Sequence, residues 1–194
     1  GRVASQVTVY VENACAPETS LHATLVDVHG VGTLLLGKSG MGKSECALEL
    51  VERGHRLVAD DIVEIRLENR IPMGRSNQVL HHHMEIRGLG IIDIRAVFGV
   101  GAVRNSKRIG LVVTLEHWKK EREYERLGLE DRVYDVLGVK VPHLVIPVRP
   151  GRNIPILVET AALTQRLSHM GTHPAKEFNK KLIQKMQSSI PGAD

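Results

Sequence analysis

The chain carries, at residues 37–44, the segment Gly37-Lys38-Ser39-Gly40-Met41-Gly42-Lys43-Ser44, which fits the pattern G-x-x-x-x-G-K-[ST] at every fixed position. Glycines in such a loop let backbone N–H groups turn toward a common point, where they bind phosphate oxygens. The Lys43 ammonium would reach the β and γ phosphates, and the Ser44 hydroxyl would be a ligand of Mg²⁺. The segment therefore predicts a binding site for a nucleoside triphosphate with magnesium.

The residues on either side of this loop favour a strand before it and a helix after it. Ala23–Val28 and Val31–Leu36 flank the dipeptide His29-Gly30 like the two arms of a hairpin, and the second arm leads into the loop. Apolar residues recur at helical spacing over Cys46–Val51, and Gly54 is placed where a left-handed helix terminator belongs. A loop that joins a strand to a helix is the context that a phosphate-binding loop requires.

The remaining elements are predicted from alternation, periodicity and turn residues. Further strands are expected at Ser5–Val11, Leu57–Asp60, Ile62–Leu67, Ile109–Leu115 and Leu144–Val148, and helices at Ala161–Met170 and Pro174–Gln187. Glu68-Asn69-Arg70 reads as a turn, and the stretch from Ile71 to Leu80 as irregular. Met84–Arg95 contains two glycines among charged and apolar residues, which favours a loop held close to a ligand.

Size and composition restrict the class of protein. The chain has 194 residues, of which 42% are hydrophobic and 25% charged, so we expect one globular domain. Its apolar runs are too short for a membrane span and no leader pattern opens it, so we expect a cytoplasmic protein without membrane contact. A net charge of +4 with only 3% aromatic residues argues against nucleic-acid binding. Two cysteines, Cys15 and Cys46, cannot form a disulfide framework.

Acidic residues follow the loop at two places. Leu57–Asp61 is an apolar strand that ends in two acids, Asp60 and Asp61, and it is similar to the second acidic motif that supports Mg²⁺ in proteins with this loop. Paired carboxylates repel each other, so one of them can have a raised pKa and act as a base. A strand edge with solvated acids is the alternative. The segment Glu85–Asp93 combines acids, an arginine and two glycines, with a plain charged turn as its alternative.

Histidines give a weaker signal. His81-His82-His83 invites a metal interpretation, but adjacent histidines on an extended chain point to opposite faces and make poor joint ligands. We therefore expect a solvated or half-buried stretch there. His22 alone would be read as an ordinary surface or core histidine.

Taken together, these motifs resemble the HPr kinase/phosphorylase family, bacterial serine kinases that act on a phosphocarrier protein. The matching segments are Gly37–Glu45, Arg53–Asp61, Glu85–Asp93, Phe98-Gly99 and Pro147–Asn153. The run Glu85-Ile86-Arg87-Gly88-Leu89-Gly90 is more distinctive for that family than the loop itself. Lys38 departs from the family, which usually has aspartate there, and Ala23 follows His22 where the family has glycine.

The resemblance implies roles for individual residues. It assigns the catalytic set to His22, Lys43, Asp61 and Arg126, the nucleotide loop to Gly37, Lys38, Ser39, Gly40, Met41, Gly42, Lys43 and Ser44, and the magnesium ligands to Ser44 and Glu85. Asp61 would take the proton of a substrate serine and return it in the reverse direction. Asp60 would support the site from behind, and Val148–Asn153 would be a loop used in dephosphorylation.

The resemblance also implies a fold and a reaction. The fold would be an α/β P-loop domain with a mixed sheet, similar to the nucleotide-binding domain of phosphoenolpyruvate carboxykinase. Residues 1–194 would be a single kinase catalytic domain, with a separate N-terminal domain outside them and assembly as a hexamer. The enzyme would phosphorylate HPr, or a paralogue, on serine with Mg²⁺ and ATP, and would reverse the reaction with phosphate, releasing pyrophosphate.

Two other functions stay open at this point. A nucleotide-dependent switch or slow ATPase would use the same loop without passing phosphate to a protein. A small-molecule kinase or a carboxykinase-like enzyme would need no protein acceptor. The segment Glu85–Asp93 argues against a switch, because a switch does not require it.

Overall fold

The computed structural model describes residues 16–77, 79–118 and 132–172. Its strands are β1 (Glu18–His22), β2 (Thr24–Val28), β3 (Val31–Leu36), β4 (Arg56–Ala59), β5 (Ile62–Glu68), β6 (Ile71–Ser76), β7 (His83–Ile86), β8 (Gly90–Asp93), β9 (Ser106–His117), β10 (Val133–Val136) and β11 (Val139–Val148). Its helices are α2 (Lys43–Glu52), α3 (Ile94–Phe98) and α4 (Ile154–His169), with one 3₁₀ turn at Val100–Ala102.

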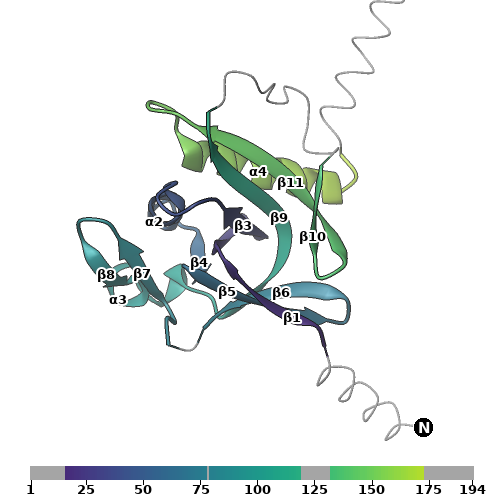
Figure 1. The fold of residues 1–194 in the computed structure, drawn as a ribbon, viewed down its shortest axis with the longest axis horizontal. Coiled ribbons are helices and arrows are strands. Elements are labelled where there is room, and N and C mark those ends of the chain that lie inside the picture. Colours follow the sequence, from purple (N-terminus) through teal and green to yellow (C-terminus); the bar gives the residue numbers. More distant parts are fainter. Residues whose placement is uncertain (1–15, 78, 119–131, 173–194) are drawn as a thin grey trace, which may run out of the picture.

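A single mixed sheet organises the described residues. Its strands run in the order β1-β5-β6-β9-β3-β2-β4, and β11 pairs with β9 while β10 pairs with β11. Strand β9 pairs in parallel with both β3 and β11, whereas its first residues pair antiparallel with β6. The predicted mixed sheet is confirmed. The small β7–β8 hairpin and helix α3 lie beside this sheet (Figure 1).

Both faces of the central strands are buried, and neighbouring residues on one strand enter different cores. Val26, Leu35 and Val113 pack with helices α2 and α4 in one cluster. Leu25, Leu34 and Val112 pack with residues of β5, β10 and β11 in the other. This alternation is the period of two expected of a strand. Because both sides are covered, every residue of β2 and all but the last of β3 are buried.

Residues with left-handed backbone set the ends of the elements around the loop. Gly42, with φ 82°, precedes the first turn of α2, and Gly54, with φ 95°, follows its last. The predicted hairpin at His29-Gly30 is confirmed, with a two-residue turn in which both residues have positive φ. Asn69 and Arg70 form a second turn of this kind between β5 and β6.

Several sequence predictions were wrong in their extent. The stretch from Ile71 to Leu80, expected to be irregular, contains β6, and Met84–Arg95, expected to be one loop, contains most of the β7–β8 hairpin and the start of α3. Strands β1 and β10 were not predicted. Helix α4 begins at Ile154, earlier than expected, because the Asn153 side chain accepts a hydrogen bond from the Ile156 amide at 3.1 Å and caps it.

The strand predicted at Ser5–Val11 and the helix predicted at Pro174–Gln187 lie outside the described residues. Within the described ranges, none of the helices combines the length and the apolar character needed to cross a lipid bilayer.

Gly32 is held between two backbones, which leads to a stability prediction. A Cβ at this position would clash with the carbonyl oxygen of Arg108 on β9, next to the point where the β3–β9 register shifts. Gly32→Ala should therefore lower the free energy of unfolding by about 1–3 kcal/mol, because the two strands must separate. Denaturant unfolding measures this change. The matched control is Gly101→Ala, where the added carbon meets nothing within 4 Å; equal losses in both variants would contradict the close approach.

Candidate phosphate-binding site

A pocket opens at the end of the sheet where the glycine-rich loop leaves β3. The residues that line it come from β1, β2, the loop, α2, the β4–β5 turn and the β7–β8 hairpin: His22, Thr24, Ser39, Gly40, Gly42, Lys43, Ser44, Glu45, Asp60, Asp61, Glu85 and Arg87. The structure thus brings together five of the residues that were assigned to catalysis or metal binding: His22, Lys43, Ser44, Asp61 and Glu85. Arg126 lies outside the described residues.

Lys43 is buried in the first turn of α2 and its ammonium group is held by the loop. Its Nζ donates to the carbonyl oxygens of Gly37 at 3.0 Å and Lys38 at 3.4 Å. Carbonyl oxygens are weaker partners for an ammonium group than phosphate oxygens, because hydrogen bonds between two charged groups are stronger. A bound phosphate can therefore recruit this ammonium group from its place against the loop.

His22 connects Lys43 with Asp61. Its Nε2 lies 3.3 Å from Lys43 Nζ and its Nδ1 lies 2.9 Å from Asp61 Oδ1. Because an ammonium group can only donate, Nε2 must accept, and Nδ1 then carries the proton that it donates to Asp61. The two neighbours thereby select one neutral tautomer of the His22 ring and align the Asp61 carboxylate.

Asp60 is almost completely buried and holds the loop serine. Its carboxylate accepts from Ser44 Oγ at 2.9 Å and 3.1 Å and from Thr24 Oγ1 at 2.7 Å. Burial raises the pKa of Asp60, although the hydrogen bonds from Thr24 and Ser44 oppose this shift. Both carboxylate oxygens are occupied and the side chain is 3% exposed, so an incoming substrate cannot reach it.

Asp61 has the opposite surroundings. Its side chain is 56% exposed at the pocket, where His22 is its partner. Its backbone is left-handed, with φ 64°, and hydrogen bonds from Ala23 N to Asp61 O (3.1 Å) and from Ile62 N to Asp60 O (2.8 Å) hold the turn. A non-glycine residue in this conformation is uncommon and is enriched at functional sites. The turn therefore places two adjacent carboxylates in different surroundings, Asp60 inside the fold and Asp61 at the pocket.

The β7–β8 hairpin contributes Glu85 and Arg87 to the other side of the pocket. A Cβ at Gly40 would lie 3.3 Å from both terminal nitrogens of Arg87, so this guanidinium group lies directly over the loop. Ser44 and Glu85 offer a hydroxyl and a carboxylate oxygen in one pocket. Oxygen donors of this kind suit Mg²⁺, so the residues present fit the metal that the loop motif implies.

The sequence assigned some residues to the pocket that do not line it, and missed others that do. Gly37, Lys38 and Met41 belong to the loop but are absent from the lining; Met41 is buried in the core instead. Thr24 and Arg87 were missed. Arg87 could have been found, because it lies inside the distinctive run Glu85–Gly90, whereas nothing local in the sequence marks Thr24. No residue of Val148–Asn153 lines the pocket in the described part of the chain.

The histidine run at residues 81–83 forms no metal cluster among the described residues. The His81 and His82 rings are in contact, with 3.7 Å between centroids and 49° between planes, and both residues are half-buried, while His83 is exposed. Burial, and then the neighbouring His81, lower the pKa of His82. The expected half-buried stretch is confirmed.

Cys46, on the buried face of α2, provides a chemical test of the packing behind the loop. Burial, and then the charge of Glu49, raise the pKa of its thiol to about 12. At pH 8 the folded chain should react with a thiol reagent about a thousandfold more slowly than the unfolded chain, because only the thiolate reacts. The measurement uses a Cys15→Ser variant, so that only Cys46 reports. Rates within tenfold of each other with and without denaturant would contradict this burial.

Fold and site together define a class. The features of a P-loop nucleotide-binding domain are all present: a mixed sheet, a glycine-rich loop after β3 that leads into Lys43 and Ser44 at the start of α2, and an acid after β4 that accepts from Ser44.

Residues 13–182 match the model of the HPr Serine kinase C-terminal domain. The chain belongs to this family. It is 53% identical over 191 residues to "HPr kinase/phosphorylase" of Leptospira biflexa, and the matched region covers 97% of this chain and 59% of the relative. It is 54% identical over 182 residues to the protein of the same name from Geobacillus kaustophilus, covering 93% and 58%. This chain therefore spans about three fifths of these relatives' length.

A solved structure whose name also refers to an Hpr kinase matches the fold. The Hpr(Ser) kinase/phosphatase from Coxiella burnetii superposes with a TM-score of 0.75 at 34% sequence identity. The match covers 82% of this chain and 98% of that chain. The expected family and fold class are confirmed.

Proposed function

We propose that this chain is the catalytic domain of an ATP-dependent protein serine kinase that phosphorylates a phosphocarrier protein of the HPr type and reverses this reaction by phosphorolysis. The observation that carries the proposal is the arrangement of Lys43, His22 and Asp61 as one hydrogen-bonded row along the pocket. This row places a phosphate-binding cation and an accessible carboxylate on the two sides of a single histidine. The names of the relatives, which contain both kinase and phosphorylase, support the same substrate and both directions.

In the forward direction, the accessible carboxylate of Asp61 takes the proton of the substrate serine hydroxyl. The serine oxygen forms a bond to the γ phosphorus of ATP, and the bond from that phosphorus to the β–γ bridging oxygen breaks, releasing ADP. Lys43 balances the charge on the transferred group, because phosphoryl transfer depends mainly on positioning and electrostatic stabilisation. His22 keeps the Asp61 carboxylate aligned and, through Nε2, lies next to the Lys43 ammonium.

In the reverse direction, inorganic phosphate attacks the phosphorus of phosphoserine. The bond between that phosphorus and the serine oxygen breaks, Asp61 returns the proton to the serine, and pyrophosphate leaves. The same residues can serve both directions, because in each a phosphoryl group passes between the serine oxygen and a phosphate oxygen at the same site, with inorganic phosphate in the place of ADP.

Ser44 and Glu85 would hold Mg²⁺, with Asp60 fixing the Ser44 hydroxyl from behind. The bound ion would neutralise charge on the phosphate oxygens. Arg87, which lies over the loop, adds a further positive charge at the same place. Arg126 is proposed as the catalytic arginine on the resemblance alone.

Three further proposals rest on the family resemblance alone. Residues 1–194 form a single catalytic domain that accompanies a second, N-terminal part in the longer relatives. The domain assembles as a hexamer, and the protein acts in the cytoplasm.

Incubation with γ-labelled ATP, Mg²⁺ and a purified phosphocarrier protein tests the proposal. Label on a serine of the carrier is expected. Bound nucleotide without any labelled acceptor would indicate a switch or slow ATPase instead, and label on a small molecule in the absence of carrier would indicate a small-molecule kinase. The phosphorylated carrier is then incubated with inorganic phosphate; free pyrophosphate is the product expected of phosphorolysis, whereas phosphate release alone would mean hydrolysis.

A further inference from the structure

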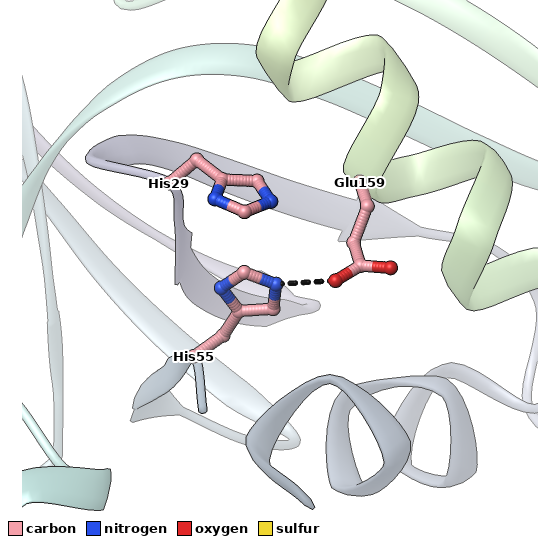
Figure 2. Close-up of side chains that lie close together, drawn as sticks. All are labelled: His29, His55 and Glu159. Carbon is pink, nitrogen blue, oxygen red and sulfur yellow. Dashed lines mark hydrogen bonds and ion pairs between the residues drawn. The ribbon is translucent and has the colours of Figure 1, made fainter. Parts of the chain in front are cut away.

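A second cluster of chemically active side chains lies away from the pocket. His29, His55 and Glu159 come from three separate parts of the chain and meet at one point (Figure 2). Each residue offers one ligand atom, and these atoms all lie within 4.8 Å of one another. It is the one group of this kind in the part of the chain that the structure describes. The proposed phosphoryl transfer uses none of the three.

The backbone fixes each residue of this cluster. His29 is the first residue of the tight β2–β3 turn, with φ 49°, and its carbonyl oxygen accepts from Arg166 Nη1 at 3.3 Å. His55 follows Gly54 at the end of α2, where its amide donates to the Leu50 carbonyl oxygen at 3.0 Å, the bond that closes a Schellman motif. Glu159 lies on α4. The three candidate ligands therefore lie in a tight turn, at the end of a helix and on a helix, and none of them lies in a long loop.

The distances show how near this cluster is to a coordination site. His55 Nε2 lies 2.7 Å from Glu159 Oε1, and the His29 ring meets the His55 ring edge-on, with 4.5 Å between centroids and 79° between planes. Ligand atoms about 2.0–2.2 Å from a tetrahedral zinc ion lie roughly 3.5 Å from one another. The His55–Glu159 pair is already within that span. The His29 ligand atom lies within 4.8 Å of the other two, so the His29 side chain must move toward them for all three residues to bind one ion.

Arg53 holds the Glu159 side chain in place. Arg53 Nη1 donates to Glu159 Oε2 at 3.1 Å, and Arg53 Nη2 donates to Glu49 Oε1 at 2.7 Å. One guanidinium group thus bridges two carboxylates, Glu49 and Glu159. Arg53 also occupies the carboxylate oxygen that faces away from His55, and such an outer partner orients a metal ligand.

We propose that His29, His55 and Glu159 form a binding site for Zn²⁺. Two imidazole nitrogens and one carboxylate oxygen are a donor set typical of zinc, and a water molecule would complete the tetrahedron. Binding displaces the proton that lies between His55 Nε2 and Glu159 Oε1, because a ligating imidazole nitrogen must be free of its proton.

The site would stabilise the domain rather than take part in phosphoryl transfer. Helix α2 has ten residues, so its length of about 15 Å separates the loop at its start from His55 beyond its end. Zinc at the far end would tie the β2–β3 turn, α2 and α4 to one another. A ligand that binds the folded state and not the unfolded state raises the melting temperature.

The test is a zinc titration of the metal-free chain by calorimetry, with Co²⁺ absorption as a second readout of tetrahedral coordination. One zinc per chain and a higher melting temperature are expected. His55→Gln, Glu159→Gln and His29→Asn should each weaken zinc binding at least about tenfold, the scale of losing one contributor to a metal site. Asparagine tolerates the left-handed backbone at position 29, which lies in a surface turn. His29→Asn should therefore fold even if the change at the buried His55 prevents folding.

His169→Gln is the matched control, because His169 ends the same helix α4 but is not in the cluster. Circular dichroism and the melting temperature without metal check the fold of every variant. No zinc binding by the parent chain, or equal affinities of His29→Asn, Glu159→Gln and the parent, would overturn the proposal and leave the His55–Glu159 contact as a plain hydrogen bond.

Discussion

Lys43→Met is expected to reduce phosphoryl transfer to the carrier protein by at least about a hundredfold, the loss typical of removing one group that stabilises charge in a transition state. Methionine keeps the length and apolar body of lysine but removes the ammonium group that now donates to Gly37, Lys38 and His22. Nucleotide affinity should fall as well, since that cation is directed at the phosphates. Initial rates with labelled ATP, together with titration of a fluorescent nucleotide, measure both effects.

Lys140→Met is the control for this change. Lys140 is an exposed lysine on β11 that does not line the pocket, so its replacement should leave the transfer rate and the nucleotide affinity close to those of the parent. A Lys43→Met variant that transferred phosphate at the parent's rate would show that the loop is not the phosphate site.

Asp61→Asn is expected to lower the transfer rate by about 10²–10⁴, the usual contribution of a positioned general base, while nucleotide affinity stays near the parent's. Asparagine accepts the hydrogen bond from His22 Nδ1 and tolerates a left-handed backbone, so the turn at φ 64° should persist. What is lost is the ability to take a proton. This separation of transfer from binding distinguishes Asp61 from Lys43, whose removal should affect both.

The control is Asp135→Asn. Asp135 is an exposed residue of β10 whose side chain accepts a hydrogen bond from the Gly138 amide, as asparagine also can. Unfolding curves show whether either variant has lost stability. Transfer by Asp61→Asn at the parent's rate would mean that another group takes the serine proton.

The loop and its flanking elements could be predicted because their signals are local. Glycines at 37, 40 and 42, the hairpin turn at His29-Gly30 and the terminator Gly54 each act on backbone a few residues away. Strand β6 was missed because Pro72 and Gly74 usually interrupt strands. Packing requires glycine at position 74, because a Cβ there would lie 2.5 Å from the Leu25 side chain. Only the folded sheet creates this contact.

The composition of the site was less predictable than the loop, because it depends on long-range pairing. Thr24 reaches Asp60 only because β2 pairs with β4, and His22 reaches Asp61 only because β1 pairs with β5. That His22 and Asp61 share a site could be predicted only from the resemblance to a family, because members of one family share the same strand pairings. Nothing comparable marked Thr24, or the meeting of His29 and His55 with Glu159.

The parallel pairing of β3 with β9 has a consequence for the order of folding. The loop starts where β3 ends, and a Cβ at Gly37 would lie 2.8 Å from the carbonyl oxygen of Leu115, so the loop rests on the last residues of β9. Chain closure over so many intervening residues is slow, because its entropy must be lost before the contacts form. A refolding chain should therefore acquire helix α2 and the β2–β3 hairpin early and phosphate binding late, which makes bound nucleotide a reporter of the finished sheet.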